Sequence, residues 1–425
     1  MTDLEIRHGR IIDPANGIDR TGCIYIRAGK ILAVDNRPAN FQATQIIDAD
    51  EQVICPGFID LSTRLREPGE TSKATIASET QAAAKGGFTS LCVPPDTRPV
   101  TDTPAVVELI RESAEQAGFL QVYPSGAFTR GLQGQELSSM HALKQAGCIA
   151  VSNARQPLEN LLILRRAMEY AASHDLLLLY QANDYWLSNH GCAHEGAFAT
   201  RYGLPGIPEV AETIALAQCL ELVKLTGCRV HFGQLSCARS VEMLHQAKDQ
   251  HLPVSADTAI HQLLLTEDDI EPFNSAYHVI PPLRSKADRQ ALREGVAIGV
   301  IDAICTDHQP HDFDAKLGAF PETEPGMSTL ETLLPLMLQL VADDVFSLQQ
   351  GVAALTIQPA AILGLDSGNL TPGASADLCL FDPESKWTVD AGHWRSRGTN
   401  TPFWGTAVTG AVTLTIQAGK IIYSQ

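Results

Sequence analysis

Between about residues 53 and 358 the chain alternates short apolar runs with longer segments in which apolar residues recur every three or four positions. Short apolar runs are typical of buried strands, and the longer segments are typical of amphipathic helices. The eight runs are Val53–Ile59, Thr89–Val93, Leu120–Tyr123, Cys148–Ser152, Leu176–Tyr180, Arg229–Gly233, Pro253–Ala256 and Val300–Cys305. Helices are expected between them, for example at Ala105–Gln116, Leu161–Ala172 and Glu209–Leu225. Eight such units predict an α/β fold, a closed (β/α)8 barrel of the TIM type.

The two ends of the chain have a different pattern, in which short alternating runs are separated by turn residues. The expected strands are Leu4–Arg7, Cys23–Arg27, Ile31–Val34, Asp377–Phe381 and Val412–Gln417. Each end also contains the tetrapeptide Ala-Gly-Lys-Ile, at Ala28–Ile31 and Ala418–Ile421, which we interpret as a hairpin turn. Alternation with period two is typical of a half-buried antiparallel sheet. We therefore predict a small β-sandwich domain formed by residues 1–52 and 359–425, and a barrel formed by residues 53–358.

The composition argues against several classes of binding partner. The chain has 425 residues, of which 44% are hydrophobic and 19% charged, and its net charge of -18 argues against binding to a nucleic-acid backbone. The ten cysteines form no CxxC pair, which favours reduced thiols in a cytoplasm. The first ten residues lack the apolar run of a signal peptide, and no run approaches the roughly 20 apolar residues of a membrane helix. We expect a cytoplasmic protein with no nucleic-acid or membrane partner.

In a barrel of this type, functional side chains stand at the carboxyl ends of the strands. The first run is followed by Asp60-Leu61-Ser62-Thr63-Arg64-Leu65-Arg66-Glu67-Pro68-Gly69. This segment resembles the signature of the dihydroorotase family, Asp-x-His-x-His-x-Arg-Glu-Pro-Gly. Two histidines one residue apart on a strand point the same way, so both can ligate one metal ion. In this chain Ser62 and Arg64 stand at those two positions, and an arginine is a permanent cation that repels a metal.

The resemblance to this family extends over almost the whole chain. Its further segments are Ala-Ala-Lys-Gly-Gly-Phe-Thr-Ser at 83–90, Gly-Leu-Pro-Gly-Ile-Pro at 203–208, Pro-Pro-Leu-Arg at 281–284, Thr-Asp-His-Gln-Pro-His at 306–311 and Asn-Thr-Pro-Phe at 400–403. So many segments in order and at the family's spacing are a specific signal. The resemblance implies the amidohydrolase barrel and, in the family's enzymes, hydrolysis of a cyclic amide by metal-activated water.

The resemblance also implies which other positions hold the metal. After the fourth strand the family has an aspartate ligand (a carboxylated lysine in some relatives), and this chain has Asn153. After the fifth and sixth strands the family has histidines, and this chain has Gln181 and Gln234. Together with Ser62 and Arg64, five ligand positions of the family are substituted. We therefore expect no zinc and no other cofactor.

Two functional positions of the family survive. Asp307 occupies the position of the general base, and Arg66 that of a contact to the substrate carboxylate. Two asparagines that resemble substrate contacts are replaced by Asp96 and Ile280. Bound zinc lowers the pKa of water from ~16 to ~7, and a carboxylate alone cannot do so. We expect Asp307 and Arg66 to be vestigial and the chain not to be an enzyme.

Three other groups of residues have alternative interpretations. His308 and His311 could be a remnant metal site, but Pro310 disfavours a continuous helix presenting both, and a structural loop is the preferred interpretation. His190, Cys192 and His194 could form a relocated metal site in a loop that varies in the family.

Arg64 and Arg66 lie on one strand face, so together they could hold an anion. Alternatively, Arg64 fills the empty metal cavity and pairs with Asp307, one cation replacing another. We prefer this second interpretation.

The resemblance leads to a preferred function and two alternatives. The chain resembles the catalytically silent dihydroorotase-like chain that in some bacteria accompanies the aspartate transcarbamoylase catalytic chain, so we expect an oligomer and an assembly role in pyrimidine biosynthesis. The first alternative is a dihydroorotase- or hydantoinase-type hydrolase with an altered or single-metal site built from Asp307, His231 and His194. The second is a ligand-sensing module that uses Arg64 and Arg66.

Overall fold

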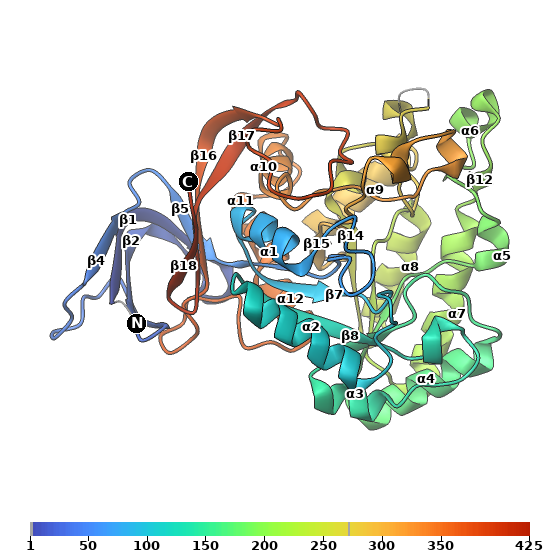
Figure 1. Ribbon diagram of the computed structural model, residues 1–425, viewed down its shortest axis with the longest axis horizontal. Helices are drawn as coiled ribbons and strands as arrows, with labels where there is room; N and C mark the ends of the chain where they lie inside the picture. The colour runs from blue at the N-terminus through green and yellow to red at the C-terminus, as the bar shows by residue number, and fades with distance from the viewer. Residues whose placement is uncertain (1–2, 271–272) are drawn as a thin grey trace.

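The computed structural model describes residues 3–270 and 273–425. It consists of a barrel and a lobe built from both termini, seen as the blue and red strands beside the barrel in Figure 1. No helix in the part of the chain that the structure describes has the length and apolar character needed to cross a membrane.

The barrel is one parallel sheet of eight strands, so the predicted fold class is confirmed. Its order is β15-β14-β13-β10-β9-β8-β7-β6. The strands are β6 (Phe58–Asp60), β7 (Phe88–Val93), β8 (Gln121–Ala127), β9 (Ala150–Ser152), β10 (Leu177–Tyr180), β13 (Val230–Phe232), β14 (Val254–Ala259) and β15 (Ala303–Cys305). A parallel bridge between Thr63 and His308 joins the segments that follow β6 and β15. The sheet is therefore closed at its carboxyl end.

Helices follow the strands as the periodicity predicts. Those of the barrel are α1 (Ile76–Lys85), α2 (Pro104–Ala117), α3 (Met140–Ala146), α4 (Leu161–Ser173), α7 (Val210–Thr226), α8 (Ala238–Asp249), α9 (Lys286–Ala297), α10 (Leu333–Ala342), α11 (Leu348–Leu355) and α12 (Ile357–Leu363). Short pieces, α5 (Tyr185–Ser188), β11 (Ala193–His194), α6 (Ala197–Tyr202) and β12 (Gly206–Ile207), lie between β10 and α7. Helix α1 begins with a capping box between Thr75 and Ser78, and α2 begins with a proline. Local sequence thus sets where these helices begin.

The lobe is an eight-stranded sheet of order β18-β17-β16-β5-β1-β2-β3, with β4 paired to β1. Its strands are β1 (Leu4–Asp13), β2 (Ile18–Arg27), β3 (Lys30–Val34), β4 (Gln45–Asp48), β5 (Val53–Pro56), β16 (Leu378–Thr388), β17 (Ala407–Gln417) and β18 (Lys420–Ser424). The sheet curls, so that Ile24 of β2 and Ile416 of β17 pack in one buried cluster. The two predicted Ala-Gly-Lys-Ile turns meet, because a Cβ on Gly419 would lie 2.8 Å from the Cα of Gly29.

The run Val53–Ile59, expected to be one barrel strand, is in fact two strands in two different sheets. β5 pairs with β1 and β16 in the lobe, whereas β6 pairs with β7 in the barrel. Gly57 stands between them, where a Cβ would lie 2.3 Å from the side chain of Thr89. The run is apolar throughout because both strands are buried, which hides the boundary in the sequence.

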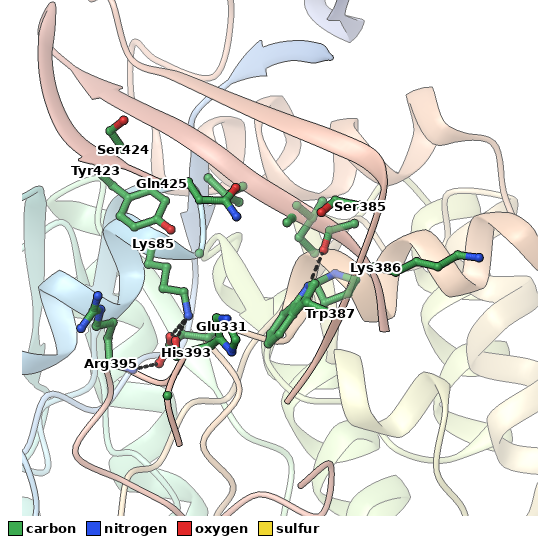
Figure 2. A pocket seen from close by; sticks show the side chains of 17 residues that line it. Lys85, Glu331, Ser385, Lys386, Trp387, His393, Arg395, Tyr423, Ser424 and Gln425 are labelled. Atoms are coloured by element: carbon green, nitrogen blue, oxygen red, sulfur yellow. Dashed lines mark hydrogen bonds and ion pairs between the residues drawn. The ribbon is translucent and has the colours of Figure 1, made fainter. Parts of the chain in front are cut away.

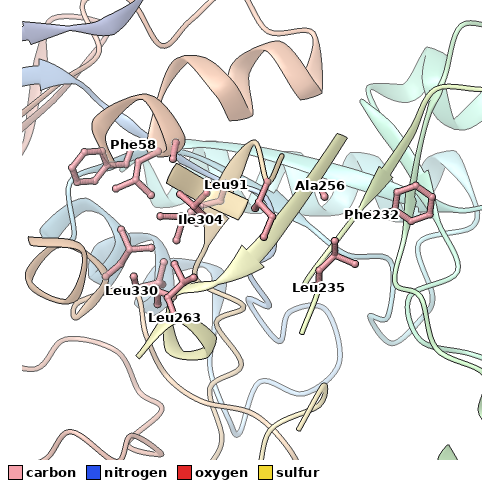
Figure 3. Packing of buried hydrophobic residues seen from close by; sticks show 14 of the residues in the cluster. Phe58, Leu91, Phe232, Leu235, Ala256, Leu263, Ile304 and Leu330 are labelled. Carbon is pink, nitrogen blue, oxygen red and sulfur yellow. The ribbon is translucent and has the colours of Figure 1, made fainter. Parts of the chain in front are cut away.

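The core of the barrel lies between its strands and the surrounding helices. Figure 3 shows part of it, with Phe58 and Leu330 at one side of the view, Phe232 and Leu235 at the other, and Leu91 and Ile304 between them. These side chains are at most 1% exposed. This core therefore holds in place the strand ends that carry the functional residues in the family.

Candidate functional site

The closure of the barrel brings the first and last strand ends together. The backbone N–H of Arg64 donates to the carbonyl of His308 at 2.9 Å, and the N–H of His308 donates to the carbonyl of Ser62 at 3.1 Å. Asp60, fully buried, accepts from the N–H of Thr306 at 2.7 Å. The segment after β15 is thereby fixed against the segment after β6.

Asp307 lies at the centre of this arrangement and is only 1% exposed. Its Oδ1 accepts from the hydroxyl of Ser62 at 3.2 Å and lies 3.6 Å from Nη1 of Arg64. Its Oδ2 accepts from Nη2 of Arg155 at 3.4 Å and from Nε2 of Gln309 at 3.0 Å. The expected pairing of Arg64 with Asp307 is confirmed, and a second arginine shares the carboxylate.

A second carboxylate balances the charge of the two arginines. Nε of Arg64 donates to Oδ2 of Asp96 at 2.8 Å. Burial alone would raise the pKa of Asp96, but Arg64, Arg66 and Arg155 hold it below its ordinary value. Asp96, predicted only as a lost substrate contact, is therefore a counterion for the arginine that replaces a metal ligand.

Arg66 has all sides of its guanidinium engaged by the protein. Nε donates to the carbonyl of Pro310 at 2.9 Å, Nη1 donates to Glu70 at 3.1 Å, and Nη2 lies 3.0 Å from Nε2 of His311. Arg64 and Arg66 thus pair with different carboxylates of the chain. The alternative in which they jointly hold an external anion is not favoured by this geometry.

The three remaining substituted ligand positions carry amides with mostly local partners. Asn153 accepts a hydrogen bond from the hydroxyl of Thr129 and donates to the carbonyl of Gln156 at 3.2 Å. Oε1 of Gln234 accepts from Arg155 at 3.3 Å, and Oε1 of Gln181 is buried without a partner in the described chain.

This donor set does not fit the zinc site of the family, because amides, a hydroxyl and a guanidinium stand where thiolate, imidazole or carboxylate is needed. Within residues 3–270 and 273–425, no group of three or more His, Cys, Asp or Glu side chains is placed to hold a metal ion.

The retained histidines of the last strand end have separate structural partners. Nδ1 of His308 accepts from the N–H of Thr329 at 3.1 Å, so its Nε2 carries the proton and donates to Glu79 at 2.8 Å. His311 contacts Arg66 and the carbonyl of Pro325. The preferred interpretation, a structural loop, agrees with these contacts.

The residues proposed for a relocated or single-metal site also have separate partners. The ring of His190 packs against Tyr185, Cys192 contacts the carbonyl of Pro205, and Nδ1 of His194 lies 3.1 Å from Arg284. His231 is bonded to Asp257 at 2.8 Å and to Ser255 at 2.9 Å. None of these bonds reaches Asp307.

Four non-glycine residues of the site have a positive φ angle. Arg66, Ala154, Gln234 and Asp307 have φ angles of 62°, 49°, 52° and 45°, a region that non-glycine residues rarely adopt. Such strain costs about 1–3 kcal/mol per residue and clusters at functional sites. The barrel thus keeps a strained backbone around a carboxylate that four protein groups already bind.

Little open space remains beside Arg64 and Arg66. The cavity beside Arg64 and Arg66 is about 10 Å³, and that beside Arg155 and Gln234 is about 20 Å³. Small-molecule sites have volumes of roughly 300–1,000 Å³. A larger cavity of about 230 Å³ is lined by Arg155 together with Asn153, Gln181 and the exposed Trp186.

Sequence reasoning missed Arg155 and Gln309. Arg155 lies two residues after a recognised ligand position, and Gln309 lies two residues after Asp307. One signal was available in the sequence. Arg155 lies two residues after the ligand position of Asn153, and Arg64 stands at another ligand position, so two arginines could have been expected at the site. The positive φ of Ala154, which redirects the chain before Arg155, could not be read from the sequence.

Mild acid is expected to destabilise the protein through His261. This histidine is 1% exposed, and burial lowers its pKa from 6.5 to about 4, with Asp307 opposing and Arg155 adding to the effect. The folded state therefore binds a proton less readily than the unfolded state, so stability is complete above pH 6.5 and falls as the pH drops toward 4. We expect the melting temperature to fall between pH 7 and pH 5, and His261→Gln to reduce that fall. An exposed control, His141→Gln, should not, and an equal acid slope in H261Q and wild type would contradict this assignment.

Comparison with solved structures defines the class of fold. The chain is similar to L-hydantoinase from Arthrobacter aurescens, with a TM-score of 0.89 and 24% identity over 100% of this chain and 96% of that one. It is also similar to dihydropyrimidinase from Brevibacillus agri, with a TM-score of 0.86 and 20% identity over 99% and 95% of the two chains. At this level of identity the likeness shows the fold alone, a barrel with a lobe as in the hydantoinase and the dihydropyrimidinase.

Sequence comparison defines the family. A dihydro-orotase-like family model matches residues 51–240, and an amidohydrolase family model matches residues 326–423. A dihydroorotase-like protein of Pseudomonas aeruginosa is 48% identical over 420 residues, 99% of each chain, and one of Pseudomonas putida is 47% identical with the same coverage. A dihydroorotase of an Anaeromyxobacter species is 41% identical over 100% of this chain and 99% of its own. This chain belongs to the dihydroorotase-like family of the amidohydrolase superfamily.

Proposed function

We propose that this chain is a non-catalytic member of its family, a pseudoenzyme that acts as a structural or regulatory subunit. The observation that carries the proposal is the binding of Asp307 by Arg64 and Arg155, with Ser62 and Gln309 on the remaining lone pairs. In the family this carboxylate is expected to accept a proton from metal-bound water. Here protein groups engage both oxygens of that carboxylate, so it has no free lone pair with which to bind and deprotonate a water molecule.

The chemistry of the substituted positions supports the same proposal. Hydrolysis of an amide by water needs a strong nucleophile, which a metal supplies by lowering the pKa of the bound water from ~16 to ~7. The guanidinium of Arg64 brings a positive charge to the site, but it can only donate hydrogen bonds and has no vacant orbital with which to coordinate water and lower its pKa. We therefore propose that the chain binds no catalytic zinc.

The partner we propose is the catalytic chain of aspartate transcarbamoylase, in pyrimidine biosynthesis. This step rests on the resemblance to a silent dihydroorotase-like chain that accompanies that transferase. Large exposed apolar side chains, which are enriched at protein interfaces, are consistent with a role through a surface. Trp186 is 80% exposed, Phe313 72% and Leu317 52%.

The partner is tested by purifying the transferase catalytic chain alone and together with this chain. We expect the two to elute together on gel filtration at a mass above either alone, and the transferase activity to depend on the complex. An active dihydroorotase from another species, added at the same concentration, is the control for non-specific association. Unchanged elution and unchanged transferase activity would overturn the proposed partner.

A further inference from the structure

A cavity of about 380 Å³ lies outside the barrel mouth, where the lobe meets the barrel. It is bounded by β16, β17 and β18 on one side, and by the end of α1 and the start of α10 on the other (Figure 2). None of the strand-end residues described above lines it. Its volume falls in the range of small-molecule sites, roughly 300–1,000 Å³, which the space around Arg64 does not.

The two sides of the cavity are aromatic. In Figure 2, Trp387 and Tyr423 stand on opposite sides of the open space. The indole of Trp387 is fixed, because its Nε1 donates to the carbonyl of Gly410 at 2.9 Å. Leu334 and Val412 add apolar surface between them. The cavity is therefore shaped for a flat apolar body.

The floor of the cavity is formed by an ion pair between Lys85 and Glu331. Glu331, whose side chain is 0% exposed, lies 2.8 Å from Nζ of Lys85. It also accepts from the backbone N–H groups of Arg395 and Ser396, both at 2.8 Å. Lys85 donates further to the carbonyl of His393 and lies 5.6 Å from the ring centroid of Trp387. These two charges neutralise each other, so neither is left for a ligand.

Two donors at the rim have no partner of their own. Within residues 3–270 and 273–425, the guanidinium of Arg395 makes no ion pair or hydrogen bond, although its backbone is anchored by Glu331. The hydroxyl of Tyr423 likewise has no hydrogen-bond partner there. Burial raises the pKa of Tyr423, with Arg395 opposing, so the hydroxyl remains a donor at neutral pH. The cavity thus offers the unpaired charge of Arg395 and a neighbouring O–H donor. Lys386 also lines the cavity, but its side chain points away from it in Figure 2.

We propose that this cavity binds a small aromatic monocarboxylate, with its ring between Trp387 and Tyr423 and its carboxylate on Arg395 and the Tyr423 hydroxyl. One uncompensated cation matches one negative charge, and a planar guanidinium suits the two oxygens of a carboxylate. Because the cavity joins the lobe to the barrel, a bound ligand contacts both parts of the chain. The site is separate from the vestigial one, and the proposal does not depend on the role of the chain as a subunit.

The test is isothermal titration calorimetry on the full chain with indole-3-carboxylate and benzoate as probes. We expect saturable binding of one molecule per chain, and no measurable binding of benzamide, which is neutral, or of cyclohexanecarboxylate, which is not flat. Arg395→Gln should weaken binding about tenfold or more, because it removes the charged partner. Arg166→Gln is the matched control: Arg166 is an exposed arginine of α4 that does not line the cavity, and the binding of this variant should equal that of wild type.

Two results would overturn the proposal. One is the absence of binding by both probes. The other is binding that R395Q leaves unchanged while the melting temperature of the variant shows that it is folded. Arg395 is exposed, so its replacement is not expected to affect folding.

Discussion

Replacing Asp307 with asparagine is expected to lower the free energy of unfolding by about 3 kcal/mol, because Arg155, whose side chain is only 17% exposed, loses its bonded carboxylate and Arg64 keeps only Asp96. Urea denaturation followed by circular dichroism measures this change. An exposed ion pair provides the matched control. Asp268 lies 2.9 Å from Lys286, both side chains are more than 60% exposed, and Asp268→Asn should cost less than about 1 kcal/mol.

This result would distinguish a structural carboxylate from a catalytic one. A catalytic base is held ready for a substrate, so neutralising it commonly costs little stability. If Asp307→Asn left the free energy of unfolding unchanged or raised it, the ion pairs of Asp307 with the two arginines would not stabilise the fold. A cycle with Arg155→Met tests the pair directly, since among the residues that the structure describes the guanidinium of Arg155 bonds only Asp307 and Gln234. We expect the two substitutions to be coupled by about 1–3 kcal/mol.

The second large effect is expected at Glu79, which joins three parts of the chain. Its carboxylate is 0% exposed and accepts from Nε2 of His308 at 2.8 Å, the hydroxyl of Ser396 at 2.6 Å, and the N–H of Arg397 at 3.1 Å. Glu79→Gln places an NH2 group against these donors. It should therefore lower the free energy of unfolding by about 3 kcal/mol. The exposed Glu112→Gln is the control and should be close to neutral.

The same residue gives a pH dependence. Burial alone would raise the pKa of Glu79, but the hydrogen bonds from His308, Ser396 and Ser78 hold it below the ordinary 4.5. A lowered folded-state pKa contributes stability that is present above pH 4.5 and is lost as the pH falls further. Wild type should lose stability below pH 4.5 more steeply than E79Q. Parallel stability curves for the two proteins in this range would contradict the assignment.

The sequence predicted much of the fold because a parallel barrel has a simple pattern. Its strands are mostly buried and read as apolar runs, and several helices begin at a local signal such as Thr75 or Pro104. The division of Val53–Ile59 was not predictable, since β5 and β6 are equally buried and the chain passes between sheets at a single glycine.

Contacts in the site could be predicted only between residues that lie directly at the ends of neighbouring barrel strands. Ser62, Arg64 and Asp307 lie on the two strand ends that close the barrel, so their contact followed from the fold. Arg155 reaches Asp307 from a loop whose direction depends on one strained residue. The bond between His308 and Glu79 joins residues 229 positions apart, which no local pattern signals.

The central claim is that this chain has lost the metal-dependent chemistry of its family while keeping the barrel. It is tested most directly by measuring metal content and dihydroorotate hydrolysis on one preparation, purified without chelator and then incubated with zinc. We predict substoichiometric zinc and no hydrolysis above the rate without protein. Stoichiometric zinc together with dihydroorotate hydrolysis that EDTA abolishes would contradict the account.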